Sequence, residues 1–179
     1  MSPYDLIGAP QLAALLVLGQ RGLEEVYSAR NTRRLMASGA TEMGSTYYPV
    51  VAATHLAWIA GLFFLIPPAA PIAWPLIAYY MALQIVRYWV IASLGPFWTH
   101  RIITLPGAPI SRSGPYRYLS HPNYAVTIIE TFVLPLAFGA LALACIMTAL
   151  WWVVLRVKIK LENEALAGRH LSQRSAAAK

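Results

Sequence analysis

Long apolar stretches, separated by short polar segments, dominate the sequence. The apolar stretches cover residues 6–20, 49–66, 72–94, 122–139 and 140–157. A helix that crosses the hydrocarbon core of a bilayer needs about 20 mostly apolar residues. The pattern therefore predicts an all-α integral membrane protein with about five transmembrane helices. The last two are expected to form a helical hairpin that turns near Gly139.

Positively charged residues are concentrated in alternate connections between these stretches. Lys and Arg gather in the 21–34 segment, in the 95–120 loop and in the tail that begins at Lys158. The first 20 residues, the Pro-rich turn at 67–71 and the turn at Gly139 carry none. Loops rich in Lys and Arg usually face the cytoplasm. We therefore expect the N-terminus to lie outside the cell membrane and the C-terminus to lie in the cytoplasm.

Composition agrees with a membrane protein and excludes other classes. Of the 179 residues, 58% are hydrophobic and 12% are charged, against about half and about a quarter in an average soluble domain. The net charge of +7 does not indicate nucleic-acid binding, because the basic residues lie between apolar runs rather than on one exposed face. Cys145, the single cysteine, can form neither an internal disulfide nor a zinc site. We expect one transmembrane domain over residues 1–179 and no metal site.

The densest group of polar and aromatic side chains lies just before and at the start of the fourth span. Residues 114–124 read Gly-Pro-Tyr-Arg-Tyr-Leu-Ser-His-Pro-Asn-Tyr. A proline suits the first turn of a helix, so Pro122 is expected to begin the span and to leave His121 at its N-terminus. The unpaired N–H groups and the dipole of a helix N-terminus favour an anionic group. The alternative is an interfacial anchor made of aromatic and Arg side chains.

Carboxylates in the last two spans are further candidates. Glu130 lies eight residues inside the fourth span, where an ionisable group is costly unless it is paired or faces a wet cavity. It is expected either in a binding site or as the structural partner of Arg87. Glu162 and Glu164 follow the fifth span and face the same side of the membrane as His121. For these two carboxylates the alternative is a solvated helix end.

The polar loop before the fourth span completes the candidate site. Its Gly and Pro residues fix turns, and Trp98, His100 and Arg101 can line a pocket. Together these groups predict a cytoplasm-facing pocket whose cations and carboxylates match a zwitterionic amino-acid group. A neighbouring apolar wall could hold a planar base or a lipid chain. Residues 94–166 are therefore the expected cofactor-binding and catalytic region, with its pocket formed by the C-terminal hairpin.

These motifs resemble the isoprenylcysteine carboxyl methyltransferase family. The family signature reads Gly-x-Tyr-x-x-x-Arg-His-Pro-x-Tyr and is followed, after a helical hairpin, by a pair of Glu; residues 114–124, Glu130 and Glu162-Asn163 resemble it. The elements Trp98-Thr-x-Arg101 and Pro106-Gly107 resemble the preceding loop of the family. The Arg-Asn-Thr-Arg-Arg stretch and the Tyr-Pro that follows it resemble a short bacterial branch, often encoded beside type III polyketide synthases.

Three positions depart from the family pattern. Ser120 stands where the family usually has Arg, which removes one cation from the motif. Asn163 stands in place of the second Glu, so Glu162 is the main carboxylate and Glu164 a possible substitute. Val126 replaces a glycine that is usual just after the motif. These departures affect the roles of individual residues more than the resemblance to the family.

The resemblance implies S-adenosylmethionine as the cofactor. Arg117 or His121 can pair with its carboxylate and Glu162 with its ammonium, and tyrosine faces attract its sulfonium. By resemblance, the cofactor pocket would be lined by Tyr116, Arg117, His121, Pro122, Asn123, Tyr124, Glu130, Glu162 and Asn163.

The resemblance also implies a lipophilic acceptor that reaches the site from the membrane lipid. The bacterial branch suggests a phenolic or pyrone hydroxyl, and the family name suggests a prenylcysteine carboxylate. A carboxylate needs no base, whereas a hydroxyl has to lose its proton, for which His100 or His121 could serve. With Arg117, these two histidines are the expected catalytic residues. The side chains expected to contact the acceptor are His55, Trp58, Trp89, Trp98 and Arg101.

Two other functions remain as alternatives. NADPH-dependent sterol reductases carry a similar His-Pro-Asn-Tyr hairpin, but they usually have more spans and a larger pocket for a dinucleotide. A non-catalytic membrane scaffold would not need charged groups that converge from two helix ends. We therefore expect an S-adenosylmethionine-dependent O-methyltransferase in the cell membrane, with its active site facing the cytoplasm.

Overall fold

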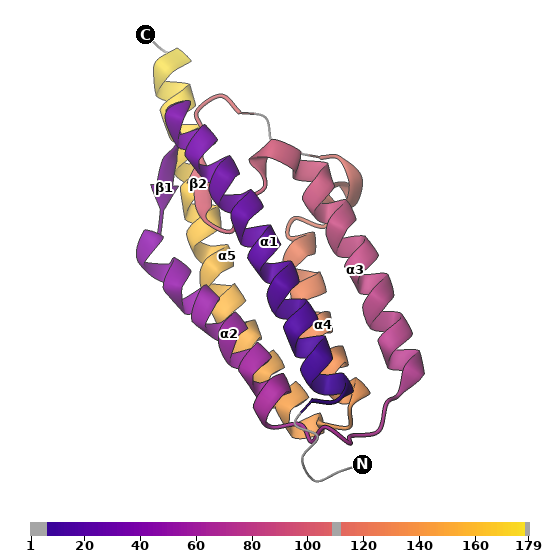
Figure 1. The fold of residues 1–179 in the computed structure, drawn as a ribbon. Helices are drawn as coiled ribbons and strands as arrows, with labels where there is room; N and C mark the ends of the chain where they lie inside the picture. Colours follow the sequence, from indigo (N-terminus) through magenta and orange to yellow (C-terminus); the bar gives the residue numbers. More distant parts are fainter. Residues whose placement is uncertain (1–6, 109–111, 178–179) are drawn as a thin grey trace.

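The computed structural model describes residues 7–108 and 112–177, and only the backbone of 166–177. The described residues form the helices α1 (Ala9–Ala37), α2 (Tyr48–Phe64), α3 (Trp74–Leu94), α4 (Pro122–Ala137) and α5 (Leu141–Ala177). Between them lie the 3-10 helices η1 (Ser45–Tyr47), η2 (Gly95–Phe97) and η3 (Gly114–Arg117) and the strands β1 (Thr41–Met43) and β2 (Ile102–Thr104). The α-helices run side by side along one long axis (Figure 1). The prediction of a mainly α-helical protein is confirmed.

The helices pack as a ring in which the sequence neighbours are not always the spatial ones. α1 packs against α2, α2 against α5, α5 against α4, and α4 against α3. The α2–α3 connection and the α4–α5 turn lie at one end of the bundle, near the start of α1 (Figure 1). The end of α1, the segment between α3 and α4, and the end of α5 lie at the opposite end. The segments rich in Lys and Arg therefore share one end of the molecule.

Proline and glycine mark the helix boundaries. Pro10, Pro49, Pro75 and Pro122 each stand in the first turn of a helix, where the missing N–H costs no intrahelical hydrogen bond. Gly139 adopts a positive φ of 74° between α4 and α5, a conformation that other residues rarely adopt. The predicted helix start at Pro122 and the predicted helical hairpin at Gly139 are both confirmed.

Three helical segments among the described residues are long and apolar enough to cross a membrane. They are Ser45–Phe64, Trp74–Phe97 and Leu141–Ala165. The helix α4 has 16 residues, and the second half of α1 is rich in charged residues. The three apolar helices support the expectation of a membrane protein.

The helix α1 extends through the polar 21–34 segment. This segment, which the sequence predicts to lie in the cytoplasm after a first span, continues the same 29-residue helix. The buried face of α1 includes Gln11, Ala14, Val17, Arg21, Glu24, Ser28, Asn31 and Leu35. Residues three or four positions apart share one face of a helix. This face is mostly apolar in its first half and mostly polar in its second half, and both halves point into the bundle.

A small antiparallel sheet lies where loops were expected. The strand β1, after α1, pairs with β2, which follows η2, and the register places Thr41 opposite Thr104. Their hydroxyls lie 3.0 Å apart. Strands of three residues are too short to show the alternation that identifies a strand in a sequence. The sheet fixes the segment after α3 against the connection between α1 and α2.

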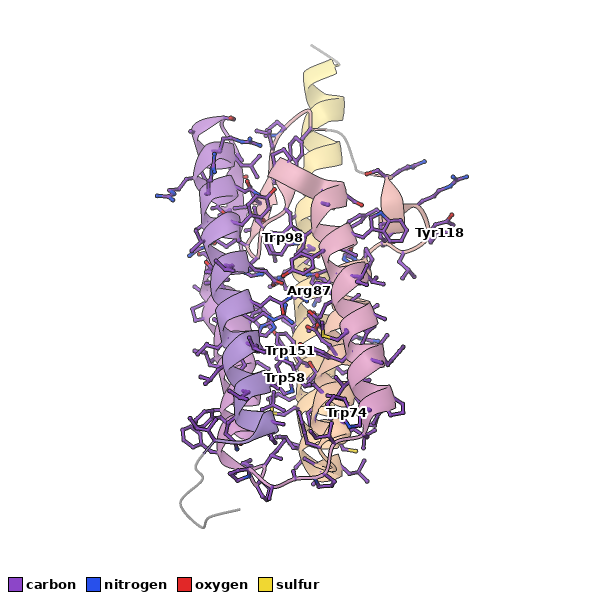
Figure 2. All side chains as sticks on the ribbon, turned by 45° about the vertical axis from the view of Figure 1, so that its right-hand side comes forward. Trp58, Trp74, Arg87, Trp98, Tyr118 and Trp151 are labelled. Carbon is purple, nitrogen blue, oxygen red and sulfur yellow. The ribbon has the colours of Figure 1, made fainter. Side chains whose placement is uncertain are left out.

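Two apolar clusters fill much of the interior, the larger one toward the Gly139 end and the smaller one between the start of α2 and the middle of α5. The larger one includes Trp58, Leu62, Leu134 and Met147, and the smaller one surrounds Trp151. Figure 2 shows Trp58, Trp151, Arg87 and Trp98 following one another through the interior along the bundle axis. The packing is therefore apolar on one side of Arg87 and increasingly polar beyond it.

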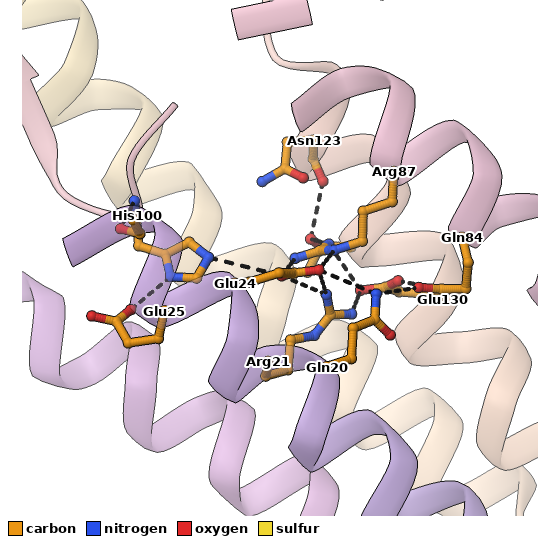
Figure 3. A network of polar contacts seen from close by, with 11 residues as sticks. Gln20, Arg21, Glu24, Glu25, Gln84, Arg87, His100, Asn123 and Glu130 are labelled. Carbon is orange, nitrogen blue, oxygen red and sulfur yellow. Dashed lines mark hydrogen bonds and ion pairs between the residues drawn. The ribbon is translucent and has the colours of Figure 1, made fainter. Parts of the chain in front are cut away.

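A buried ion network surrounds Arg87 and joins α1, α3 and α4 (Figure 3). The Nε and Nη2 atoms of Arg87 donate to Glu24 on α1 at 2.7 and 2.6 Å. Its Nη1 atom donates to Glu130 on α4 at 3.2 Å. Arg21 donates to both Glu24 oxygens at 2.9 Å and also pairs with Glu130. Gln84 donates to the second Glu130 oxygen at 3.1 Å.

The network balances two positive charges with two negative ones. All four charged side chains are buried, and Glu130 is completely inaccessible. Removing one charge from such a group leaves the opposite charges uncompensated in a medium of low dielectric constant, which costs about 3–5 kcal/mol. The sequence-based alternative that Glu130 is a structural partner of Arg87 is thus confirmed, and Arg21 and Glu24 are added to the pair.

Replacing Glu130 by Ala should strongly destabilise the bundle, because Arg21 and Arg87 then lose a shared carboxylate. We expect the free energy of unfolding in detergent to fall by about 3–5 kcal/mol. The matched control is Glu164→Ala, which removes an exposed carboxylate 4.0 Å from Lys160 and should change it by less than about 1 kcal/mol. Equal effects of both substitutions would contradict the account of the network.

Candidate active site

The start of α4 and the second half of α5 meet through three side chains. His121 immediately precedes α4, and its Nδ1 lies 3.2 Å from the Oε2 atom of Glu162 on α5. The Tyr124 hydroxyl donates a hydrogen bond to the other oxygen of Glu162. The rings of His121 and Tyr124 stack with centroids 5.3 Å apart and planes inclined by 8°. The hairpin therefore brings the predicted motif and the predicted carboxylate into direct contact.

Lys158 lies one turn before Glu162 and faces the same cluster. Its Nζ atom lies 5.2 Å from the centroid of the Tyr124 ring and donates to the backbone carbonyl of His100 at 2.9 Å. The side chain is buried. Lys158 was not predicted as a site residue, although its i, i+4 spacing from Glu162 places both side chains on one face of a helix. This lysine links the loop before α4 to the cluster around Tyr124.

Asn123 contributes a buried amide to the same region. Among the described residues its Oδ1 atom has no hydrogen-bond partner. Its backbone carbonyl accepts from the Thr127 hydroxyl at 3.0 Å, and that hydroxyl lies 3.3 Å from Nη1 of Arg87, which donates to it (Figure 3). The ion network therefore touches the first turn of α4 directly.

Tyr116 and Arg117 lie in η3, beside this cluster. Tyr116 is half-buried, and this burial raises the pKa of its phenol. The negative charge of Glu162 raises this pKa further. Arg117 is exposed. Gly114 begins η3 with a positive φ of 54°, and a Cβ at this position would lie 2.2 Å from the Ser93 hydroxyl. The close approach of η3 to α3 therefore requires a glycine.

The structure does not place Glu130 and Asn163 beside His121 in the way that it places Glu162. Glu130 is occupied by Arg21, Arg87 and Gln84 in the ion network. Asn163 is exposed on α5 and lines an open groove of about 570 Å³ with Arg156, Lys160 and Glu164. The expected cofactor residues therefore lie in three places: the cluster around His121 and Glu162, the ion network, and the open groove on α5. Pro122 is buried at the start of α4.

The residues expected to contact the acceptor are also dispersed. Trp58 lies in the apolar core, and His55 makes an edge contact with Trp151 at 4.4 Å between ring centroids. Trp89 is exposed on α3. Two others lie at the loop after α3, where Trp98 stacks on Tyr27 at 5.9 Å and Arg101 donates to Glu42 at 2.9 Å.

His100 is held from several sides at the inner edge of that loop. Its Nδ1 lies 2.8 Å from the Oε2 atom of Glu25 on α1 (Figure 3), and its backbone N–H donates to the Ser28 hydroxyl at 2.8 Å. Burial lowers the pKa of His100, although its hydrogen bond to Glu25 and the charge of Glu24 oppose this. The hydrogen bond with His100 in turn lowers the pKa of Glu25. Glu25 was not identified from the sequence.

The comparison with known families decides the classification. Residues 76–168 match the model of the isoprenylcysteine carboxyl methyltransferase (ICMT) family, and these residues contain the His121–Glu162 cluster and the ion network partners Arg87 and Glu130. The chain belongs to the ICMT family. The resemblance noted from the motifs is thus confirmed, and the ICMT assignment identifies a membrane methyltransferase in general.

Two relatives match most of the chain. The protein named "Uncharacterized protein YpbQ" of Bacillus subtilis (strain 168) is 35% identical over 159 residues, which cover 87% of this chain and 94% of that protein. A protein of Haemophilus influenzae (strain ATCC 51907 / DSM 11121 / KW20 / Rd), named "Uncharacterized protein", is 27% identical over 156 residues, covering 83% and 88%. No solved structure matches the chain. The similarity to both relatives therefore extends well beyond the segment matched by the ICMT family model.

The protonation of His100 gives a direct test of the site geometry. Because burial lowers its pKa, His100 should titrate below an exposed histidine, whose pKa is about 6.5, and should be neutral at pH 7. Glu25→Gln replaces the charged acceptor that raises this pKa by a neutral one, so the pKa should fall further. Histidine-selective NMR titration in detergent measures both values. A His100 that titrates at or above 6.5, or a rise in Glu25→Gln, would contradict this geometry.

Proposed function

We propose that the chain is an S-adenosylmethionine-dependent methyltransferase that acts on a lipophilic acceptor at the cytoplasmic face of the cell membrane. The observation that carries the proposal is the contact of Glu162 with His121 and Tyr124 across the α4–α5 hairpin. ICMT family members use this cofactor in general. When bound, the cofactor supplies a methyl group from a positively charged sulfonium.

The chemistry of the donor set fits this cofactor. Glu162 is a carboxylate suited to an ammonium group, and the buried Oδ1 of Asn123, unpartnered within the part of the chain described, is an acceptor suited to a ligand N–H or O–H. The exposed Arg117 and the N–H groups at the start of α4 are suited to a carboxylate. The stacked rings of His121 and Tyr124 offer an aromatic face for a cation. These residues would hold the cofactor, with Tyr116 and Pro122 beside them.

A lipid hydroxyl, phenolic or pyrone, is the proposed acceptor, with prenylcysteine carboxylate as the other candidate. Methyl transfer from a sulfonium is an in-line displacement that depends mainly on proximity and orientation. The acceptor is apolar and would enter from the bilayer, whereas the charged cofactor would enter from the cytoplasm. Trp98 and Arg101 lie in the loop next to the cofactor residues and are the best placed of the predicted acceptor contacts.

The proposed topology has five crossings, with α1 and α4 added to the three long apolar helices. All five helices run along the same axis, and the segments rich in Lys and Arg lie at one end (Figure 1). Positively charged loops favour the cytoplasmic side. The C-terminus and the His121–Glu162 cluster would then face the cytoplasm, and the N-terminus would lie outside.

Removing the carboxylate of Glu162 or the guanidinium of Arg117 should weaken cofactor binding. Each substitution, Glu162→Gln or Arg117→Ala, should cost about 1–3 kcal/mol, the scale of a hydrogen bond to a charged group. The dissociation constant of S-adenosylhomocysteine for the purified protein in detergent measures the effect. Glu164→Gln, an exposed carboxylate on the same helix, is the matched control. If both variants keep the native affinity while folded, the pocket lies elsewhere.

The topology predicts the activity of reporter fusions. A reporter fused after the C-terminus should be active in the cytoplasm, and one inserted at Pro68, in the connection between α2 and α3, should be active on the far side of the membrane. Paired cytoplasmic and extracytoplasmic reporters at both positions check this directly. A cytoplasmic reporter signal at Pro68 would rule out the five-crossing arrangement.

A further inference from the structure

A partly exposed imidazole–carboxylate pair, His100 with Glu25, lies next to the cofactor residues but outside them. Glu25 is ionised and can only accept hydrogen bonds, so the Nδ1 atom of His100, 2.8 Å away, has to carry the hydrogen. The other ring nitrogen, Nε2, is then the basic one. It lies 3.9 Å from the Oε2 atom of Glu24, beyond hydrogen-bond distance. The side chain of His100 is 19% exposed, so the ring is within reach of a ligand.

The position of His100 is fixed by contacts with three parts of the fold. Ser28 on α1 accepts its backbone N–H at 2.8 Å, and Lys158 on α5 donates to its carbonyl at 2.9 Å. The Trp98 ring makes an edge contact with the imidazole at 4.7 Å between centroids. Asn31, one turn beyond Ser28, donates to the carbonyl of Trp98 at 2.9 Å. These contacts hold both the backbone and the ring of His100 in one position.

Lys158 sets the distance between this pair and the cofactor residues. Its ammonium group contacts the His100 carbonyl on one side and the Tyr124 ring on the other. Tyr124 in turn contacts Glu162. His100 is therefore separated from the proposed cofactor site by a single side chain. Beside it lie the buried ring of Trp98 and the more exposed ring of Tyr27, which make its surroundings apolar.

We propose that His100 is the general base that removes the proton of the acceptor hydroxyl, and that Glu25 is the positioning residue that orients its imidazole. This inference rests on the proposed function, because it assigns a role in the transfer to a hydroxyl. His121, the other candidate base, is among the residues proposed to hold the cofactor, together with Glu162 and Tyr124. His100 is outside that group, and its ring faces Glu24 and Glu25 on α1 (Figure 3).

The charged groups that face His100 suit a base that gains and then releases a proton. Glu24 and Glu25 on α1 stabilise the protonated imidazole, while Arg87 on α3 and Lys158 on α5 oppose it. In the transfer, the acceptor O–H bond breaks and its proton moves to Nε2 of His100. The acceptor oxygen forms the bond to the methyl carbon, and the carbon–sulfur bond breaks with its electron pair retained by sulfur. The imidazolium then returns the proton to water.

The test compares two alkylresorcinols in reconstituted protein: one with an ordinary phenol, and one with ring fluorines whose hydroxyl is already ionised at the assay pH. His100→Asn should lower kcat/KM for the neutral phenol by about 100-fold or more, the usual scale of general-base catalysis. It should change the rate with the ionised phenol by less than about threefold. Glu25→Gln should lower the rate with the neutral phenol by about tenfold. It should also change the rate with the ionised phenol by less than about threefold.

The pH profile separates a positioning role from a structural one. For the native protein, kcat/KM with the neutral phenol should level off above the pKa of His100, and Glu25→Gln should move that limb to lower pH. In His100→Asn the rate should instead climb about tenfold per pH unit until the phenol ionises. The control Glu42→Gln removes a carboxylate that pairs with Arg101 in the same loop and should keep the native profile.

The proposal and the proposed function fail in different ways. The affinity for S-adenosylhomocysteine should be unchanged in His100→Asn and Glu25→Gln, which also shows that both variants fold. If both variants lose kcat/KM equally with the neutral and the ionised phenol, His100 is not the base. The same conclusion follows if His100→Asn keeps the plateau of the native pH profile. If the native protein binds no S-adenosylhomocysteine and methylates neither resorcinol, the proposed function itself is wrong.

Discussion

Four charged side chains that have to be buried together determine how this bundle is assembled. Arg21 and Glu24 on α1 meet Arg87 on α3 and Glu130 on α4. Inside a membrane protein, leaving any one of these charges without its partners costs several kcal/mol. This requirement draws α1 onto α3 and α4, although α1 packs mainly against α2. The larger apolar cluster fills the interior toward the Gly139 end.

The same network connects to both parts of the candidate site. Through Thr127 it reaches the first turn of α4, where Asn123 stands beside His121. Through the inward face of α1 it reaches the loop after α3, since Ser28 holds the backbone of His100. Lys158 joins these two parts at the level of α5. The ion network, α1 and Lys158 together therefore position the cofactor residues of the hairpin and the proposed base relative to each other.

The sequence was most informative where one local rule decided the structure. The apolar runs predicted the long helices, Pro122 the start of α4, Gly139 the hairpin, and the motif the contact with Glu162. It was less informative where tertiary contacts decide. The burial of Arg21 and Glu24 in the polar 21–34 segment was not predicted, because charge alone does not distinguish an exposed face from one that meets opposite charges. The segment's three- and four-residue spacing, which continues the buried stripe from Gln11, is the signal that was available. The roles of Glu25 and Lys158 depend on partners about 60 to 75 residues away.

The central claim is that the α4–α5 hairpin and the loop before it form a site for S-adenosylmethionine in a membrane methyltransferase. Isothermal titration calorimetry of the purified protein in detergent, with S-adenosylhomocysteine and with NADPH in parallel, tests it most directly. The account predicts saturable binding of S-adenosylhomocysteine at one site per chain and no binding of NADPH. Saturable binding of NADPH without any binding of S-adenosylhomocysteine would contradict it.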